Sequence, residues 1–226
     1  MPPDVSGQPD PLARFAGHVA HDLNNLLTAI LGNLELLQSR ARRNGVSEFD
    51  GFIESANRAG GRAVQLVHRL TVFSGGDAQE PSLQFLGQLI QGLEEHARSG
   101  NIKVTFRVAN TDALLLCDPA RANIALVELL NNAADAIAEG GEISVEAGAP
   151  DGLVFIRVRD TGRGMAPETL AKAGEVFFTT QPSRAGRGLG LPIVARFAAE
   201  TGGRMEIASE LGRGCQVTLS LPRAGA

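Results

Sequence analysis

Residues 21–25 read His-Asp-Leu-Asn-Asn, which places an imidazole directly before a carboxylate and one helical turn before an amide. A carboxylate that accepts the N–H of one ring nitrogen keeps the other ring nitrogen basic, so an exposed histidine of this kind can act as a nucleophile. At 100° per residue, His21 lies about 190° from the mean direction of the apolar residues around it and should face solvent. His18 shares that face and is the rival acceptor. A surface histidine is more often merely solvated, so the segment alone indicates little.

Two further segments could hold a metal ion and a base. Glu128 and Asn132 are four residues apart, so they share a face of an expected helix and supply the oxygen ligands that Mg²⁺ takes together with substrate phosphates. Residues 160–164 read Asp-Thr-Gly-Arg-Gly directly after an apolar strand. Asp160 can accept a hydrogen bond from the amino group of a base, and the glycines allow close backbone approach to a ligand. An ordinary polar helix face and a hairpin turn are the alternative interpretations.

A glycine-rich segment opens the last expected helix. Residues 186–191 read Gly-Arg-Gly-Leu-Gly-Leu, and glycines that open a helix expose N–H groups at its positive end, where phosphate binds. The segment lacks the Lys and Ser/Thr of a P-loop and does not follow a strand of a parallel βαβ unit, as a dinucleotide fingerprint would. Residues 177–185 precede it with two phenylalanines and a polar run, which we interpret as a mobile lid.

The N-terminal part of the chain should form an antiparallel pair of amphipathic helices. Apolar residues repeat every three or four positions from about Pro11 to Arg42, after which an Asn-Gly pair ends the first helix. Ser47 is the expected N-cap of the second helix, whose apolar residues follow a heptad seam from Phe49 to Phe73. One hairpin cannot cover both of its apolar faces, so a dimeric four-helix bundle is expected.

The rest of the chain alternates strands and helices. Helices are expected at residues 86–98, 119–138 and 189–201, and strands at 102–108, 113–117, 142–147, 153–159, 204–209 and 214–221. Asp118 and Pro119 provide the N-cap and first turn of the second of these helices. The order predicts an α+β domain with a mixed, mostly antiparallel sheet. The expected boundaries are a disordered leader at 1–10, the helical hairpin at 11–74, a linker at 75–81 and the α+β domain at 82–222.

The composition of the chain argues against several classes of function. A net charge of -4, with no Trp and no Tyr, argues against nucleic-acid binding. No apolar run reaches the roughly 18 residues that a membrane span needs, and the N-terminus does not have the pattern of a signal peptide. Cys117 and Cys215 lie far apart and are expected to be free buried thiols in a reducing compartment. We therefore expect a cytoplasmic protein without direct membrane insertion.

In their order and spacing, these segments resemble the motifs of two-component sensor histidine kinases. Residues 21–25 resemble the phosphoacceptor box of the dimerisation and histidine-phosphotransfer domain, and residues 128–132 resemble the N box. Residues 160–164 resemble the first glycine box, residues 177–180 resemble the F box, and residues 186–191 resemble the second glycine box. The resemblance covers the chain from about residue 11 to residue 222. It implies that the second domain is an ATP-binding α/β sandwich of the GHKL type, as in gyrase and Hsp90.

The resemblance implies a catalytic role for three residues of the first helix. His21 would attack the γ-phosphate of ATP, Asp22 would assist as general base, and Asn25 would position water when the protein acts as a phosphatase. The hairpin of residues 11–74 would form the homodimer. An aspartate of a response-regulator receiver domain would take the phosphoryl group from the histidine.

The resemblance also implies a set of residues that bind ATP and Mg²⁺. Asn132 would bind the metal with support from Glu128, and Asp160 would recognise the adenine amino group. The implied set comprises Glu128, Asn132, Asp135, Asp160, Gly162, Gly164, Thr179, Thr180, Arg184, Arg187, Gly188, Leu189 and Gly190.

Two positions depart from the family pattern, and two other functions stay open. Val176 stands where the family usually has a proline before the two phenylalanines. Gln181 stands where the family often has lysine, so Arg184 or Arg187 would supply that charge instead. The chain could instead be a phosphotransfer or phosphatase docking module with little autokinase activity, although such a module needs no glycine boxes. It could also be a GHKL ATP-binding switch protein, although those lack a helical hairpin that carries a histidine.

Overall fold

The computed structural model describes residues 11–76, 78–98, 103–137, 140–180 and 188–225. These residues form two compact units, the first within residues 11–76 and the second from residue 78 onward. None of the described helices is both long enough and apolar enough to cross a membrane. The expected leader at residues 1–10 lies outside the described residues.

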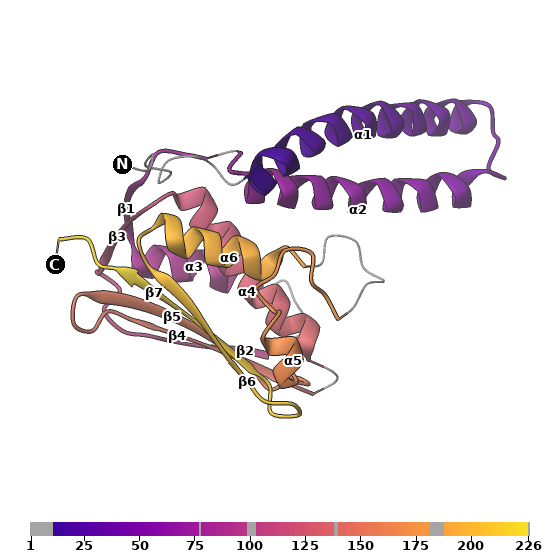
Figure 1. Cartoon of the computed structure of the whole chain (residues 1–226). Coiled ribbons are helices and arrows are strands. Elements are labelled where there is room, and N and C mark those ends of the chain that lie inside the picture. Colours follow the sequence, from indigo (N-terminus) through magenta and orange to yellow (C-terminus); the bar gives the residue numbers. More distant parts are fainter. Residues whose placement is uncertain (1–10, 77, 99–102, 138–139, 181–187, 226) are drawn as a thin grey trace. The chain divides into compact units, whose positions relative to one another are not determined.

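The first unit is an antiparallel helical hairpin made of α1 (Pro11–Arg43) and α2 (Asp50–Ser74) (Figure 1). Each helix begins and ends within about three residues of the bounds expected from the sequence. The expected N-cap was wrong: Phe49 occupies that position and makes no side-chain cap. The reason is a turn before the helix, in which the amide of Asp50 donates to the backbone carbonyl of Ser47 at 3.1 Å.

The two helices pack through small residues on α1 and larger ones on α2. On α1 the buried residues are Ala13, Ala16 and Ala20, and on α2 they are Ile53, Gly60, Val67, Leu70, Val72 and Phe73. Gly60 has a packing role, because a Cβ atom there would overlap the side chain of Leu31. The missing side chain admits Leu31 and offsets the helix propensity of about 1 kcal/mol that a glycine forfeits.

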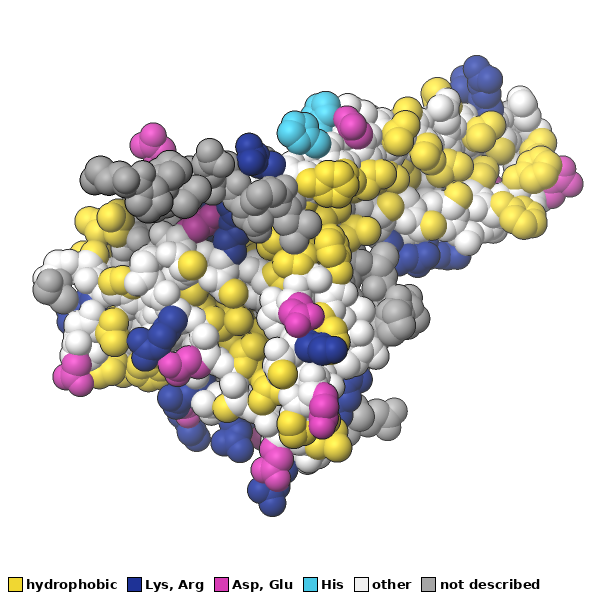
Figure 2. All heavy atoms as spheres, in the orientation of Figure 1, with side chains coloured by type: hydrophobic (Ala, Val, Ile, Leu, Met, Phe, Trp, Pro, Cys, Tyr) yellow, Lys and Arg dark blue, Asp and Glu magenta, His cyan; other side chains and the backbone are white. Residues whose placement is uncertain are grey.

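A long row of apolar side chains stays exposed on the hairpin, as Figure 2 shows along its visible face. On α1 these residues are Phe15, Leu23, Leu26, Ile30, Leu36 and Leu37, and on α2 they include Phe52, which is 76% exposed. The seam expected on α2 is therefore only partly internal to one chain. Its first residues are exposed, whereas Ile53 and Val67, which lie outside the seam, are buried. Exposed apolar rows of this length are typical of surfaces that bind another chain.

The second unit is a sheet covered by helices on one face (Figure 1). Its five-stranded sheet has the order β2-β4-β5-β7-β6, with β2 and β4 parallel and the other pairs antiparallel. The strands are β2 (Lys103–Val108), β4 (Glu142–Gly148), β5 (Leu153–Asp160), β6 (Arg204–Ser209) and β7 (Cys215–Pro222). The helices are α3 (Leu86–Arg98), α4 (Pro119–Ala136), the short α5 (Pro167–Leu170) and α6 (Gly190–Glu200). This confirms the expected α+β class.

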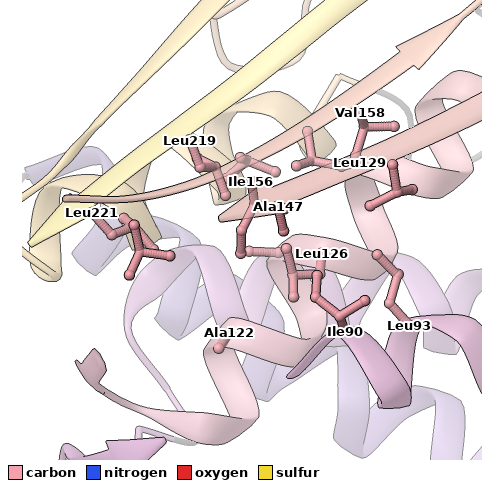
Figure 3. Packing of buried hydrophobic residues seen from close by; sticks show 14 of the residues in the cluster. Ile90, Leu93, Ala122, Leu126, Leu129, Ala147, Ile156, Val158, Leu219 and Leu221 are labelled. Carbon is pink, nitrogen blue, oxygen red and sulfur yellow. The ribbon is translucent and has the colours of Figure 1, made fainter. Parts of the chain in front are cut away.

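The core of this unit lies between the sheet and helices α3, α4 and α6. Figure 3 shows Ile90 and Leu93 of α3 and Leu126 of α4 directed toward Ile156 of β5 and Leu219 of β7. Burial alternates along β4 and β5, as expected for strands with one face on helices and one face in solvent. The core therefore fixes α4 against β5, the two elements that carry the expected nucleotide residues.

Local signals account for the start of α4 but not for every element. The Asp118 carboxylate accepts from the amides of Ala120 and Arg121 at 2.9 and 3.1 Å, which confirms the expected cap. A short strand, β1 (Ser82–Phe85), was not expected and pairs with β3 (Leu114–Cys117) in a separate two-stranded sheet. The short helix α5 was also not expected.

Candidate functional site

His21 projects from α1 into solvent beside a carboxylate. The side chains of His21 and Asp22 are 76% and 82% exposed, and His21 Nδ1 lies 3.3 Å from Asp22 Oδ1. Figure 2 shows histidine and acidic side chains next to each other at the surface of the hairpin. When Asp22 accepts the Nδ1–H, the lone pair remains on Nε2, which becomes the free nucleophilic atom. The exposed position agrees with the expectation from helical periodicity.

Two neighbours on the same helix complete this surface. Asn25 is exposed one turn after His21. His18 is also exposed, but its Nδ1 lies 3.0 Å from the backbone carbonyl of Arg14 instead of a carboxylate. A carboxylate stabilises an imidazolium that forms at its partner more strongly than a neutral carbonyl does. The geometry therefore favours His21 over His18 as the acceptor.

Glu128 and Asn132 lie on α4 against the first residue of α6. Glu128 is only 6% exposed. A Cβ atom built on Gly190 would lie 2.9 Å from Glu128 Oε2 and 3.1 Å from Asn132 Oδ1, so both oxygens converge beside this glycine. Asn132 Nδ2 is buried and has no hydrogen-bond partner among the described residues. A buried amide left unpaired in this way is typical of a site that a ligand completes.

Asp160 ends β5 and is 4% exposed. Its Oδ1 accepts from the amide of Gly162 at 2.7 Å and from the amide of Cys215 at 3.3 Å. Burial raises the pKa of this carboxyl, while the backbone hydrogen bonds oppose that shift. A buried carboxylate held mainly by backbone amides is a candidate binding group, because a ligand that donates a hydrogen bond would stabilise its charged form.

The glycine segment after Asp160 packs against the end of α4. The amide of Arg163 donates to the carbonyl of Ala136 at 3.0 Å, and a Cβ atom on Gly162 would overlap that same residue. The first glycine box therefore lies against the helix that carries Glu128 and Asn132. The structure thus brings the residues expected to bind a base and a metal into one region of the second unit.

The residues around the expected lid are described in part. The amide of Phe177 donates to the carbonyl of Gly188 at 2.8 Å, so the two ends of this loop meet. Thr180 Oγ1 lies 3.4 Å from Arg163 Nη2, which connects this segment to the first glycine box. Thr179 and Asp135 are half-buried. Arg184 and Arg187 lie outside the described residues.

Leu189 is the N-cap of α6, and Gly190 is the first residue of that helix. The Leu189 side chain is fully buried in the core, so this residue can offer a ligand only its backbone. The helix has no side-chain cap at this end, which leaves its first N–H groups without the usual side-chain acceptor. This is the local geometry that binds phosphate at a helix start.

The comparisons with known proteins agree with this geometry. Residues 12–79 match the family described as the His Kinase A (phospho-acceptor) domain, and residues 117–225 match the family described as Histidine kinase-, DNA gyrase B-, and HSP90-like ATPase. The chain is 31% identical over 94% of its length to the Sensor kinase CckA of Brucella abortus, of which it covers 24%. It is 31% identical over 93% of its length to the Sensor histidine kinase ZraS of Escherichia coli K12, of which it covers 45%.

Solved structures of histidine kinases share this fold. Full-length ShkA in complex with AMPPNP has a TM-score of 0.76 and 29% identity, with 95% of this chain and 46% of that chain covered. The catalytic domain of the histidine kinase ThkA has a TM-score of 0.56 and 28% identity, with 64% of this chain and 97% of that chain covered. The chain belongs to the two-component histidine kinases and contains the phosphoacceptor and ATPase-type domains of that family's core. It spans less than half the length of the two curated relatives named above.

One group of residues beside the candidate site was missed by the sequence analysis. The turn between β6 and β7 contacts Asp160 and the first glycine box, yet the sequence indicated only two strands there. The signal that could have found it is the pair of glycines at positions 212 and 214. Both adopt positive φ angles, of 78° and 82°.

Proposed function

We propose that this chain transfers the γ-phosphoryl group of ATP to Nε2 of His21 and then passes it to an aspartate of a response-regulator receiver domain. The observation that carries the proposal is the contact between His21 Nδ1 and Asp22 Oδ1 on the exposed face of α1. Family membership supports the same reaction, because one matching family is defined by a phospho-acceptor domain and the other by an ATPase.

Asp22 prepares His21 for attack in two ways. It accepts the Nδ1–H and so fixes the tautomer with the lone pair on Nε2. It also stabilises the positive charge that the ring gains as Nε2 bonds to phosphorus and ADP leaves. As the general base, Asp22 then takes up the Nδ1 proton, which leaves a neutral phosphohistidine ring. The solvent-exposed position of the ring lets a phosphate carried by a separate domain reach it.

Asp160 is proposed to recognise adenine. Both of its described hydrogen bonds from Gly162 and Cys215 end on Oδ1, and we assign Oδ2 as the acceptor of the exocyclic amino group. A hydrogen bond to a buried charged acceptor is worth about 1.5–3 kcal/mol, enough to select a base that carries an amino group. Gly162 and Gly164 keep the neighbouring backbone clear of side chains.

Glu128 and Asn132 are proposed to hold Mg²⁺, and the residues fit that ion. Their oxygens converge beside Gly190, and carboxylate and amide oxygens are ligands that Mg²⁺ accepts together with phosphates. The bound ion would neutralise charge on the transferring phosphoryl group. The backbone amides at the start of α6 would bind phosphate oxygens of the same nucleotide.

The exposed apolar row of the hairpin is proposed to bind a second copy of this chain. Side chains such as Leu26, Ile30 and Phe52 are more than half exposed on one hairpin, and two hairpins would bury them as a four-helix bundle. Asn25, one turn from His21, is proposed to position water for dephosphorylation of the receiver domain. Because this reaction consumes ATP and modifies a signalling partner, we place it in the cytoplasm.

A direct test combines two measurements on the full chain. Calorimetry with ATP and Mg²⁺ should show binding, and γ-labelled ATP should produce phosphate on the protein that is labile in acid and stable in base. Absence of nucleotide binding would favour the docking-module alternative. Phosphoserine on a second protein, without phosphohistidine on this one, would favour the ATP-binding switch.

A further inference from the structure

The turn between β6 and β7 packs on the backbone of the first glycine box. Ser209 and Cys215 face each other as the last pair of the two strands. Within the turn, the amide of Gly212 donates to the carbonyl of Arg163 at 2.7 Å. Gly164, with φ 64°, leaves no room for a side chain, since a Cβ atom would overlap the carbonyl of Glu210. The two backbone segments therefore touch directly.

The Ser209 hydroxyl connects these segments. It accepts the amide N–H of Met165 at 2.9 Å and donates to the carbonyl of Gly214 at 2.8 Å. A hydroxyl has one proton and two lone pairs, so both bonds can form together. Each bond polarises the other, which strengthens the pair. Ser209 thus fixes the position of the glycine box relative to the turn.

The second bond of Ser209 leads to Asp160 through one peptide group. The carbonyl of Gly214 and the amide of Cys215 belong to the same planar unit, so orienting one orients the other. Ser209 holds the carbonyl end of this unit, and the N–H end donates to Asp160 Oδ1 at 3.3 Å. Rotation of this peptide group would turn the N–H away from the carboxylate. The amide of Gly162 donates to the same oxygen at 2.7 Å, so the Asp160 carboxylate is held from two sides. One of these two sides depends on the Ser209 hydroxyl.

We propose that Ser209 is a positioning residue for base selection: it acts through the Gly214–Cys215 peptide group to aim the Asp160 carboxylate at the amino group of adenine. This inference rests on the proposed role of Asp160. Loss of the hydroxyl leaves the phosphate and metal groups on α4 and α6 in place. It weakens only the discrimination between bases with and without that amino group.

The test compares the affinities of the full chain for ATP and for inosine triphosphate, which lacks the amino group. Ser209→Ala should lower the preference for ATP by about threefold to tenfold, the effect of one misdirected hydrogen bond, and leave the affinity for inosine triphosphate unchanged. Ser209→Thr keeps the hydroxyl and should restore the preference. Ser220→Ala is the matched control. Ser220 is also a half-buried serine, but it lies on β7 on the face of the sheet opposite the buried Leu219 and Leu221.

Each outcome separates this inference from the proposed function. If Asp160→Asn removes the preference for ATP but Ser209→Ala does not, base recognition stands and the role of Ser209 is rejected. If Asp160→Asn keeps the preference, the proposed role of Asp160 fails. If Ser209→Ala weakens both nucleotides equally, the hydroxyl only supports the fold and the inference is overturned. Should Ser209→Ala not fold, Ser209→Cys is the second variant, since a thiol is a weaker donor and acceptor. It should also lower the preference for ATP, and an unchanged preference would overturn the inference.

Discussion

Gly190 leaves the space that the Asn132 side chain needs: a Cβ atom at position 190 would lie 2.8 Å from Asn132 Nδ2. The same atom would lie 2.9 Å from Glu128 Oε2. One small residue at the start of α6 thus controls the placement of both groups that we assign to Mg²⁺. Two elements that are distant in sequence, α4 and α6, meet at this point of the second unit.

Substitution of this glycine should therefore damage metal-dependent nucleotide binding. We expect Gly190→Ala to lower the affinity for ATP with Mg²⁺ by at least about tenfold, as a displacement worth roughly 1.4 kcal/mol would do. The loss should be smaller when Mg²⁺ is chelated. Gly174→Ala is the control, because Gly174 is exposed and none of the described residues would come within 4 Å of a Cβ atom added there. Equal affinities of Gly190→Ala and Gly174→Ala for ATP with Mg²⁺, measured by calorimetry, would show that the contact of Gly190 with Asn132 and Glu128 has no role in binding.

Asp160→Asn should separate folding from nucleotide binding. The amide oxygen of asparagine can still accept from Gly162 and Cys215, whereas its NH₂ group opposes the adenine amino group. We expect the affinity for ATP to fall by at least about tenfold, measured by calorimetry, with the fold retained.

The same substitution has a pH dependence with a defined sign. Burial holds the pKa of Asp160 in the folded state above its ordinary value. The protonated carboxyl therefore favours folding at low pH, and this stabilisation is lost as pH rises through the folded-state pKa. Urea unfolding without nucleotide should show that the stability of Asp160→Asn relative to the wild type increases as pH rises above about 4. A relative stability that decreases as pH rises would contradict the assignment.

The adjacent glycines of α2 should respond differently to alanine. Gly61 is exposed, and none of the described residues would come within 4 Å of an added Cβ, so Gly61→Ala should stabilise the hairpin by about 1 kcal/mol through helix propensity. At Gly60 the added Cβ would overlap Leu31, so Gly60→Ala should give less stabilisation or a net loss. Thermal unfolding of the two variants in parallel measures the difference. Equal stabilisation would mean that Leu31 does not pack there.

Both cysteines are free, as expected, but only Cys117 is buried; Cys215 is half-buried. Both should react slowly while the protein is folded. Burial, with a smaller effect from the Asp160 charge, raises the pKa of Cys215 to about 11, and burial raises the pKa of Cys117 to about 11 as well. The thiolate is the reactive form, so alkylation by iodoacetamide near neutral pH should be roughly a hundredfold slower than in urea-unfolded protein. Mass spectrometry resolves the two sites. Folded protein that is alkylated as fast as unfolded protein would contradict the burial of these thiols.

Sequence analysis predicted the features that depend on residues close together in the chain. The Asp118-Pro119 pair predicted the start of α4, and apolar periodicity predicted that His21 faces solvent. Alternation of polar and apolar residues located the strands of the sheet to within a residue or two. These features depend on residues a few positions apart, so the sequence contains them directly.

Features that depend on distant residues could not be predicted in this way. The strand β1 exists only because β3 pairs with it. The hydrogen bond from Cys215, the first residue of β7, to Asp160 joins residues 55 positions apart. The prediction that Ser47 caps α2 was wrong. The Ser47 carbonyl accepts a hydrogen bond from the Asp50 amide in a backbone turn, and Phe49 occupies the N-cap position. Tertiary contacts decide such cases, whatever the local propensity.

The identity of the phosphorylated histidine tests the account most directly. The full chain should be incubated with γ-labelled ATP and Mg²⁺ as wild type, His21→Ala and His18→Ala. We predict acid-labile, base-stable phosphate on wild type and on His18→Ala, and none on His21→Ala, although His21→Ala binds ATP with wild-type affinity. Label that persists in His21→Ala, or that disappears only in His18→Ala, would contradict the assignment of His21 as the acceptor.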